Sequence, residues 1–132
     1  MNGFGIGSDI ESIKRFKKLN PVGSRIFLNK IFTKNEIDYC YSKKVPAPHL
    51  AVRFSAKEAI NKALNSIGRR GVSYKEIEVL NNKKGVPVVK IIRQGFDHLH
   101  FYISLSHCED KALAFAIVAE KNDYEKDQRD DR

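Results

Sequence analysis

The hydrophobic pattern at the start of the chain predicts a strand followed by a helix. Residues 4–7 favour a short strand that ends in the small residues before Asp9. The apolar residues of 10–19 then recur at intervals of three, which is a helical period, and Pro21 is expected to end that helix. Residues 24–32 show no decisive pattern. The other faces of the predicted helix carry the basic residues Lys14, Arg15, Lys17 and Lys18.

A long helix is the clearest element that the sequence predicts. It should begin near Pro48 and end before Gly68, because glycine favours the position just after a helix end. A shorter helix should precede it, since Thr33 and Glu36 form a capping box, and should run to about Ser42. The apolar stripe of the long helix consists of Ala56, Ala59, Ile60, Ala63, Leu64 and Ile67.

The second half of the chain carries the patterns of strands. Residues 77–79 and 86–92 predict two strands joined by a turn-rich connection over 81–85. Apolar and polar residues alternate over 101–106, as in a half-buried strand. The segment 113–118 is apolar on both faces and belongs at the centre of the sheet. Helices come mostly first and strands mostly after, which predicts an α+β domain.

Length and composition fit one globular domain in a chain of 132 residues. The longest apolar run, 112–119, is far shorter than the roughly 20 residues that a membrane-spanning helix needs. The N-terminus has no secretion signal, so we expect a cytoplasmic protein without a membrane partner. The domain is expected over 1–121, with a polar, disordered tail over 122–132. Two cysteines are too few for a disulfide framework, and both Cys40 and Cys108 are expected to be free thiols.

The net charge of +8 is distributed unevenly. Residues 1–66 hold 12 basic and 5 acidic residues, whereas residues 67–132 hold 12 and 11. A one-sided positive field of this kind recruits a polyanion, which includes nucleic acid, anionic lipid, a phosphorylated ligand and an acidic protein. The charge alone does not choose among these partners.

Several residues that bear chemistry also have a plain structural interpretation. Glu58 and Lys62 are four residues apart on the long helix, where they share a face and fit a surface salt bridge. Asp9, between a strand and a helix, also fits a helix N-cap. The other candidates that fit ordinary polar or solvent-facing positions are Arg53, Lys57 and His107.

Three blocks of sequence, taken together, indicate a protein family far more specifically than any of their residues does alone. They are Gly-Ile-Gly-Ser-Asp at 5–9, Arg-Phe-Ser-Ala-Lys-Glu-Ala-Ile-Asn-Lys-Ala at 53–63, and Ser-Leu-Ser-His at 104–107. In this order and spacing they resemble the 4′-phosphopantetheinyl transferases of the holo-acyl-carrier-protein synthase type. The resemblance also covers 77–81 and the Gly-x-Pro at 85–87. It implies an α+β fold with one long central helix packed on a small, mainly antiparallel sheet.

The resemblance also implies an activity and its partners. Members of this family transfer the phosphopantetheine arm of coenzyme A to a serine of an apo acyl carrier protein and release adenosine 3′,5′-bisphosphate. The reaction needs Mg²⁺ and supports fatty-acid biosynthesis. The short chain agrees with the single-module type, which is a homotrimer with active sites at protomer boundaries.

The same resemblance assigns roles to residues of this sequence. Asp9 and Glu58 match the metal carboxylates, and Mg²⁺ prefers such oxygen ligands. Glu58, directly or through a metal-held water, is the candidate base, while Lys62 would stabilise charge on the pyrophosphate. The positions implied near the coenzyme are Arg53, Lys62, Gly85, Pro87, Ser106 and His107. An acidic carrier protein is expected to dock on Lys14, Arg15 and Lys18, with Arg25 and Lys30 as the alternative surface.

A second class of function explains the charge equally well. A nucleic-acid-binding α+β module without catalysis would use the same basic half, and the Gly-x-x-Gly at 68–71 fits the loop of a KH domain. However, a strand rather than a helix is expected after this loop. Asp9 and Glu58 also oppose phosphate binding unless a metal accompanies them. We therefore expect an enzyme, with no nucleic acid as partner.

Overall fold

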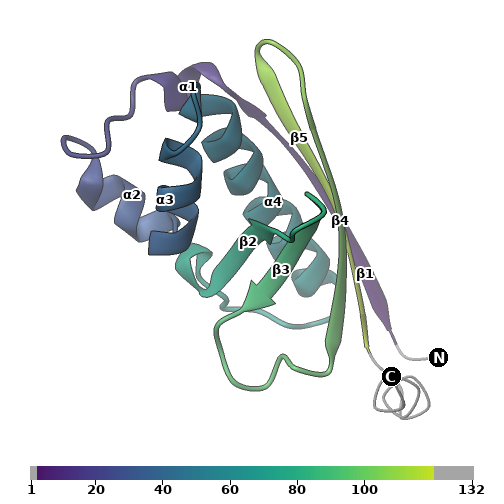
Figure 1. The fold of residues 1–132 in the computed structure, drawn as a ribbon. Helices are drawn as coiled ribbons and strands as arrows, with labels where there is room; N and C mark the ends of the chain where they lie inside the picture. The colour runs from purple at the N-terminus through teal and green to yellow at the C-terminus, as the bar shows by residue number, and fades with distance from the viewer. Residues whose placement is uncertain (1–2, 121–132) are drawn as a thin grey trace.

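The computed structural model describes residues 3–120, which form an α+β domain around one long helix. Figure 1 shows helix α4 between a three-stranded antiparallel sheet and the shorter helices α1 to α3, with a separate two-stranded hairpin beside it. The predicted fold class is confirmed, whereas the predicted tail over 122–132 lies outside the described residues. The elements are β1 (Phe4–Ser12), α1 (Lys14–Lys17), α2 (Arg25–Ile31), α3 (Lys34–Tyr41), α4 (Pro46–Ser66), the 3₁₀ turn η1 (Tyr74–Glu76), β2 (Ile77–Asn81), β3 (Pro87–Ile91), β4 (Leu99–His107) and β5 (Lys111–Glu120).

Helix α4 confirms the predicted long helix and begins two residues before Pro48. Pro46 takes the first position of the helix, where a missing backbone N–H costs nothing. The predicted apolar stripe is buried except at Ile67, which is half-buried. The interpretation of Arg53 and Lys57 as a solvated face is wrong, because both side chains are buried. Within residues 3–120, no helix is long and apolar enough to cross a membrane.

Strand β5 lies at the centre of the three-stranded sheet, in the order β1-β5-β4, as its apolar sequence predicts. Only one of its faces is covered by α4. Leu113 and Phe115 on the opposite face keep 46% and 42% of their area exposed. The sheet therefore presents an uncovered apolar surface on the side away from the helices. The residues of β5 that pack under α4 are Ala112, Ala114, Ala116 and Val118.

The first strand is longer, and the first helix shorter, than the hydrophobic pattern predicts. Strand β1 continues to Ser12, because it pairs with β5 along its whole length. Asp9 pairs with Ala114 inside the sheet and is therefore not a helix N-cap, while Ile10 is 60% exposed. The helix predicted over 10–19 is reduced to the four residues of α1.

Helices α2 and α3 complete the N-terminal half. The segment 24–32, which has no decisive sequence pattern, contains helix α2. The capping box predicted at Thr33 and Glu36 is present, and α3 ends at Tyr41, one residue before the expected Ser42. Local side-chain chemistry therefore fixed the start of α3, whereas packing fixed α2.

Two glycines allow β1 to lie directly against α4. A Cβ atom at Gly7 would be 2.1 Å from the carbonyl oxygen of Ala59, and one at Gly5 would be 2.1 Å from that of Ala63. No side chain fits at either distance. The close approach brings Asp9, two residues further along β1 on the same face, to the middle of α4.

Candidate active site

A hydrogen bond to the backbone of Asp9 holds this residue against α4. The Ser55 hydroxyl donates a hydrogen bond of 2.9 Å to the Asp9 carbonyl oxygen. The Asp9 side chain is only 12% exposed, and its Oδ1 atom lies 3.6 Å from Nζ of Lys62. In the described part of the chain, Asp9 Oδ2 is buried and has no hydrogen-bond partner. One oxygen of the Asp9 carboxylate thus faces the Lys62 ammonium, and the other has no hydrogen-bond partner among the described residues.

Lys62 reaches from α4 to β1. Its ammonium donates a 2.9 Å hydrogen bond to the carbonyl oxygen of Ser8, in addition to the contact with Asp9. The side chain is 55% exposed, so the charge is accessible from solvent. No ion pair joins Glu58 and Lys62 among residues 3–120, and the alternative of a surface salt bridge between them is therefore wrong. Lys62 and Asp9 form the pair instead.

Glu58 is half-buried on the same part of α4, and its partner is a residue that sequence reasoning missed. The hydroxyl of Tyr74, in η1, donates a hydrogen bond to Glu58 Oε1. This hydrogen bond, with burial second, raises the pKa of Tyr74 to about 12. The phenol consequently stays protonated and remains a donor over the whole physiological range. No sequence signal links the two, since they are 16 residues apart on different elements.

A third carboxylate, Glu11, was also not foreseen from the sequence. It lies on the same face of β1 as Asp9 and forms an ion pair of 3.1 Å with Arg15 Nη1. Burial raises the pKa of Glu11 to about 7, and the neighbouring Asp9 carboxylate acts in the same direction. Glu58 adds to this shift. The three acidic side chains therefore share one patch of negative potential with Lys62 at its edge.

The carboxylates fit a magnesium ion chemically. Mg²⁺ is bound in proteins by one or two carboxylates, with the remaining positions filled by water and substrate phosphates. Asp9 Oδ2 is a buried acceptor without a partner, and Glu58 keeps its Oε2 free of the Tyr74 hydrogen bond. Residues 3–120 contain no group of three or more His, Cys, Asp or Glu side chains arranged around one point. Within residues 3–120, Asp9 and Glu58 could thus supply two carboxylate oxygens to such an ion.

Arg53 is buried on another face of α4 and its guanidinium is engaged by the protein. It donates from Nε to the Val79 carbonyl oxygen at 3.1 Å and from Nη2 to Asn81 Oδ1 at 3.4 Å. Its Cζ atom also lies 4.2 Å from the ring centroid of Tyr39. These contacts tie α4 to the β2–β3 hairpin. The structure thus places Arg53 beside the hairpin rather than beside Glu58.

Basic side chains surround His49, one turn before Arg53 on α4. Burial is the main cause that lowers the pKa of His49, and the positive charges of Arg53, Lys43 and His107 act in the same direction. His107, at the end of β4, therefore belongs to the same electrostatic neighbourhood as Arg53. Among residues 3–120, no ion pair joins Arg53 or Lys43 to a carboxylate, so this basic neighbourhood is suited to phosphate groups.

The remaining predicted coenzyme residues lie on two separate surfaces. Gly85, with a φ of +80°, closes the turn between β2 and β3, and Pro87 begins β3 opposite Asn81. Ser106 pairs with Leu113, whose own partner is Ile10, so it lies on the uncovered face of the sheet. Within one protomer, Ser106 is therefore on the opposite face from Asp9.

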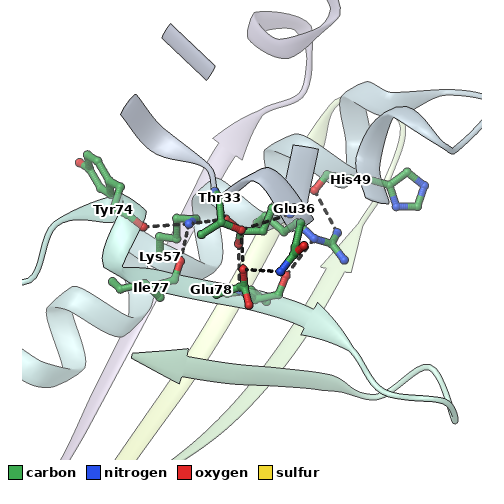
Figure 2. A network of polar contacts seen from close by, with 10 residues as sticks. Thr33, Glu36, His49, Lys57, Tyr74, Ile77 and Glu78 are labelled. Carbon is green, nitrogen blue, oxygen red and sulfur yellow. Dashed lines mark hydrogen bonds and ion pairs between the residues drawn. The ribbon is translucent and has the colours of Figure 1, made fainter. Parts of the chain in front are cut away.

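A buried polar network links Lys57 with residues of three other elements (Figure 2). The ammonium of Lys57 donates to Glu36 Oε1 at 2.7 Å, to the Tyr74 carbonyl oxygen at 2.8 Å and to the Ile77 carbonyl oxygen. Next to it, Glu78 accepts a 2.6 Å hydrogen bond from the Thr33 hydroxyl. The network joins α3, α4, η1 and β2, and thereby fixes the segment that carries Tyr74.

The predicted docking residues Lys14, Arg15 and Lys18 are all exposed beside the site. Lys14 and Arg15 belong to α1, and Lys18 follows it. Arg15 is less free than its neighbours, because it pairs with Glu11 and its Cζ atom lies 5.3 Å from the ring centroid of Phe54. The alternative residues Arg25 and Lys30 lie on α2, and Arg25 lines a cavity of about 210 Å³.

The matched residues and the fold define one class of protein. The family model described as "4′-phosphopantetheinyl transferase superfamily" matches residues 5–118, which includes Asp9, Glu58, Lys62 and His107. The chain belongs to this superfamily.

Within it, the chain is an enzyme of the holo-[acyl-carrier-protein] synthase type. It is 46% identical over 117 residues to the holo-[acyl-carrier-protein] synthase of Protochlamydia amoebophila, an alignment that covers 86% of this chain and 95% of the relative. The synthase of Thermodesulfovibrio yellowstonii is 45% identical over 114 residues, with 86% and 96% covered.

Solved structures show the same fold. A synthase from Bacillus anthracis in complex with coenzyme A (3′,5′-ADP) is 30% identical and has a TM-score of 0.72, with 89% of this chain and 96% of that chain covered. A synthase from Helicobacter pylori in complex with coenzyme A is 29% identical, also with a TM-score of 0.72, with 86% and 98% covered.

Proposed function

We propose that this enzyme transfers the 4′-phosphopantetheine arm of coenzyme A to a serine hydroxyl of an apo acyl carrier protein. The serine oxygen bonds to the phosphorus that carries the pantetheine arm, and the bond from that phosphorus to the bridging oxygen breaks. Adenosine 3′,5′-bisphosphate leaves, and the serine proton passes to a base of the enzyme. The observation that carries the proposal is the contact of Lys62 on α4 with Asp9 on β1, one helical turn from Glu58 on the same face of α4.

Asp9 and Glu58 are the residues that would hold Mg²⁺. The ion neutralises charge on the pyrophosphate and orients it when it is bound. The partnerless Asp9 Oδ2 atom supports this role, since a buried carboxylate oxygen without a donor calls for a cation. Lys62 places its ammonium against the pyrophosphate and stabilises the leaving group. Glu58 accepts the serine proton, directly or through a water molecule.

The coenzyme phosphates and adenine are assigned to the basic neighbourhood and the hairpin. Arg53 and His107 supply positive charge, although Arg53 must keep its contacts with β2 while doing so. Gly85 and Pro87 line the turn beside the adenine. Two solved relatives are complexes with coenzyme A, which supports coenzyme A as the substrate.

We further propose that the enzyme is a homotrimer whose protomers meet through the uncovered face of the sheet. Soluble monomers rarely leave a contiguous apolar surface of this kind open. Ser106 lies on this face, so it would contribute to the active site of a neighbouring protomer. Asp9 would contribute to the active site of its own protomer. The large side chains exposed on this face are Phe4, Ile6, Ile10, Tyr102, Leu113 and Phe115.

The oligomer is tested by sedimentation velocity. Phe115→Glu should dissociate the trimer and abolish transfer, because it places a charge in an apolar interface. Val22→Glu is the matched control, since Val22 is 73% exposed but lies outside the sheet. A wild-type enzyme that sediments as a monomer at assay concentration would contradict the trimer.

An acyl carrier protein is the partner that suits the exposed basic residues Lys14, Arg15 and Lys18. Carrier proteins of this kind are acidic, and complementary charge accelerates docking. We also propose that the enzyme serves fatty-acid biosynthesis in the cytoplasm. None of the matched families or relatives supports the alternative of a nucleic-acid-binding module.

The decisive experiment follows the mass of a carrier protein. The enzyme is incubated with coenzyme A, Mg²⁺ and an apo acyl carrier protein, and intact mass spectrometry detects the added phosphopantetheine group. A carrier whose acceptor serine is changed to alanine is the control and should gain no mass. If the wild-type carrier also gains none with Mg²⁺ present, the proposed function is wrong.

A further inference from the structure

Tyr74 is held at both of its ends by consecutive residues of α4. Its carbonyl oxygen accepts a 2.8 Å hydrogen bond from Nζ of Lys57, and its hydroxyl donates to Oε1 of Glu58. One residue of η1 is thus fastened to the helix through its backbone and through the tip of its side chain. This arrangement leaves the phenol little freedom to choose another partner.

The ring between these two ends is also fixed. It packs against Phe54, with ring centroids 5.4 Å apart and planes inclined by 44°. Phe54 is buried and precedes Glu58 by one helical turn, so ring and carboxylate share one side of α4. The η1 segment itself is anchored by the Ser73–Glu76 capping box and by an ion pair of 3.1 Å between Glu76 and Arg93.

The hydrogen bond decides how Glu58 presents its carboxylate. A bond from a neutral hydroxyl to a carboxylate is charge-assisted and stronger than a bond between neutral groups. It occupies Oε1 and leaves Oε2 free of this bond, on a residue that shares a face of α4 with Lys62. Without it, a half-buried glutamate would have several rotamers of similar energy, and only some of them point at a shared metal.

We propose that Tyr74 is a positioning residue that fixes Glu58 in the orientation needed for the metal site. This inference rests on the proposed function, because the site it serves is the Mg²⁺ site of that reaction. Tyr74 does not touch the reacting atoms in this assignment. It acts through Glu58, and the ammonium of the buried Lys57 holds its backbone carbonyl oxygen (Figure 2).

The test removes only the hydroxyl, with Tyr74→Phe. The Mg²⁺ concentration for half-maximal transfer should rise about tenfold or more, which is the usual effect of losing a hydrogen bond to a metal ligand. At saturating Mg²⁺ the rate should return to near the wild-type value, since Asp9, Glu58 and Lys62 remain. Direct binding of Mn²⁺ to the enzyme with coenzyme A, measured by electron paramagnetic resonance, should weaken by a similar factor.

Tyr41→Phe is the matched control. Its hydroxyl is buried on α3 and, among residues 3–120, has no hydrogen-bond partner. The same chemical change there should leave both the Mg²⁺ requirement and Mn²⁺ binding unchanged. Thermal unfolding of both variants distinguishes an effect on the position of Glu58 from a loss of protein stability.

Each result distinguishes the inference from the function on which it rests. A Tyr74→Phe enzyme with wild-type Mg²⁺ dependence and Mn²⁺ affinity overturns the role of Tyr74 alone. A lower melting temperature with unchanged metal behaviour also overturns it, because the residue is then merely structural. A wild-type enzyme that needs no divalent metal and binds no Mn²⁺ with coenzyme A overturns the proposed metal site, and the role of Tyr74 with it.

Discussion

Lys57 and Glu36 form an ion pair of 2.7 Å in which neither side chain is exposed to solvent. Burial is the main cause that lowers the pKa of Lys57, and the charge of Glu36 opposes this shift. The same carboxylate accepts hydrogen bonds from the backbone N–H groups of Thr33 and Val79. One pair thus caps α3, anchors β2 and holds α4.

Lys57→Met should destabilise the protein strongly. It leaves the Glu36 carboxylate buried without its cation, and breaking one partner of a buried pair costs about 3–5 kcal/mol. Urea denaturation monitored by circular dichroism measures the loss. The matched control is Lys62→Met, whose side chain is 55% exposed and should cost less than about 1 kcal/mol. Equal losses in the two variants would contradict the structural role of Lys57.

Gly7→Ala should damage both stability and activity. The new Cβ atom would lie 2.1 Å from the Ala59 carbonyl oxygen, so β1 must move away from α4. Forcing a methyl group into a packed contact costs roughly 1–3 kcal/mol, and the shift carries Asp9 away from Lys62. Gly3→Ala is the control, because its nearest neighbour, Ile67 Cγ2, would be at an ordinary 3.8 Å. Thermal unfolding and the transfer rate should change only at Gly7.

Asp9→Asn and Glu58→Gln should each lose most of the transfer rate at limiting Mg²⁺ while the protein stays folded. Each change replaces a charged oxygen ligand by a neutral one, and Mg²⁺ prefers carboxylates. Higher Mg²⁺ should restore part of the activity. Titration of the rate against Mg²⁺ gives the measurement, with circular dichroism as the check on folding. Near-normal rates for either variant at limiting Mg²⁺ would remove that residue from the metal site.

Lys62→Ala should lower kcat more than it raises KM for coenzyme A. Its charge is assigned to the leaving group, where it matters more in the transition state than in the bound ground state. The exposed contact with Asp9 predicts only a small change in stability. Steady-state kinetics and thermal unfolding, performed on one preparation, distinguish the two effects. A kcat equal to the wild-type value would reject the catalytic role of Lys62.

Lys14→Glu and Lys18→Glu should each raise KM for the carrier protein several-fold and leave KM for coenzyme A nearly unchanged. Reversing a charge adds repulsion against an acidic partner. These lysines are better probes than Arg15, which also pairs with Glu11. Lys90→Glu, an equally exposed change on β3, is the control. Carrier kinetics at low salt provide the readout, and values within twofold of wild type would favour Arg25 and Lys30 as the docking surface.

Elements whose formation depends on residues close together in the sequence were predictable without a structure. The capping box at Thr33, the stripe of α4 and the turn that ends in Gly85 are local patterns, and each element was found within a few residues. Asp9, Glu58 and Lys62 could be nominated because their sequence blocks are distinctive. The pairing of Lys62 with Asp9 could not be predicted from the sequence. Helical spacing favours a pair between Lys62 and Glu58, which are four residues apart.

The sequence by itself determined the α+β class, the long helix and the central strand, because these follow from periodicity, while the resemblance of its motifs to a known family nominated the catalytic residues. Only the tertiary structure decided that β1 continues through Asp9 to Ser12, since its hydrogen bonds go to β5, about 100 residues further along the chain. It also decided that Lys57 is buried and that Tyr74 meets Glu58, because both partners come from distant segments. Contacts between distant segments depend on how the elements pack, so no local sequence pattern predicts them.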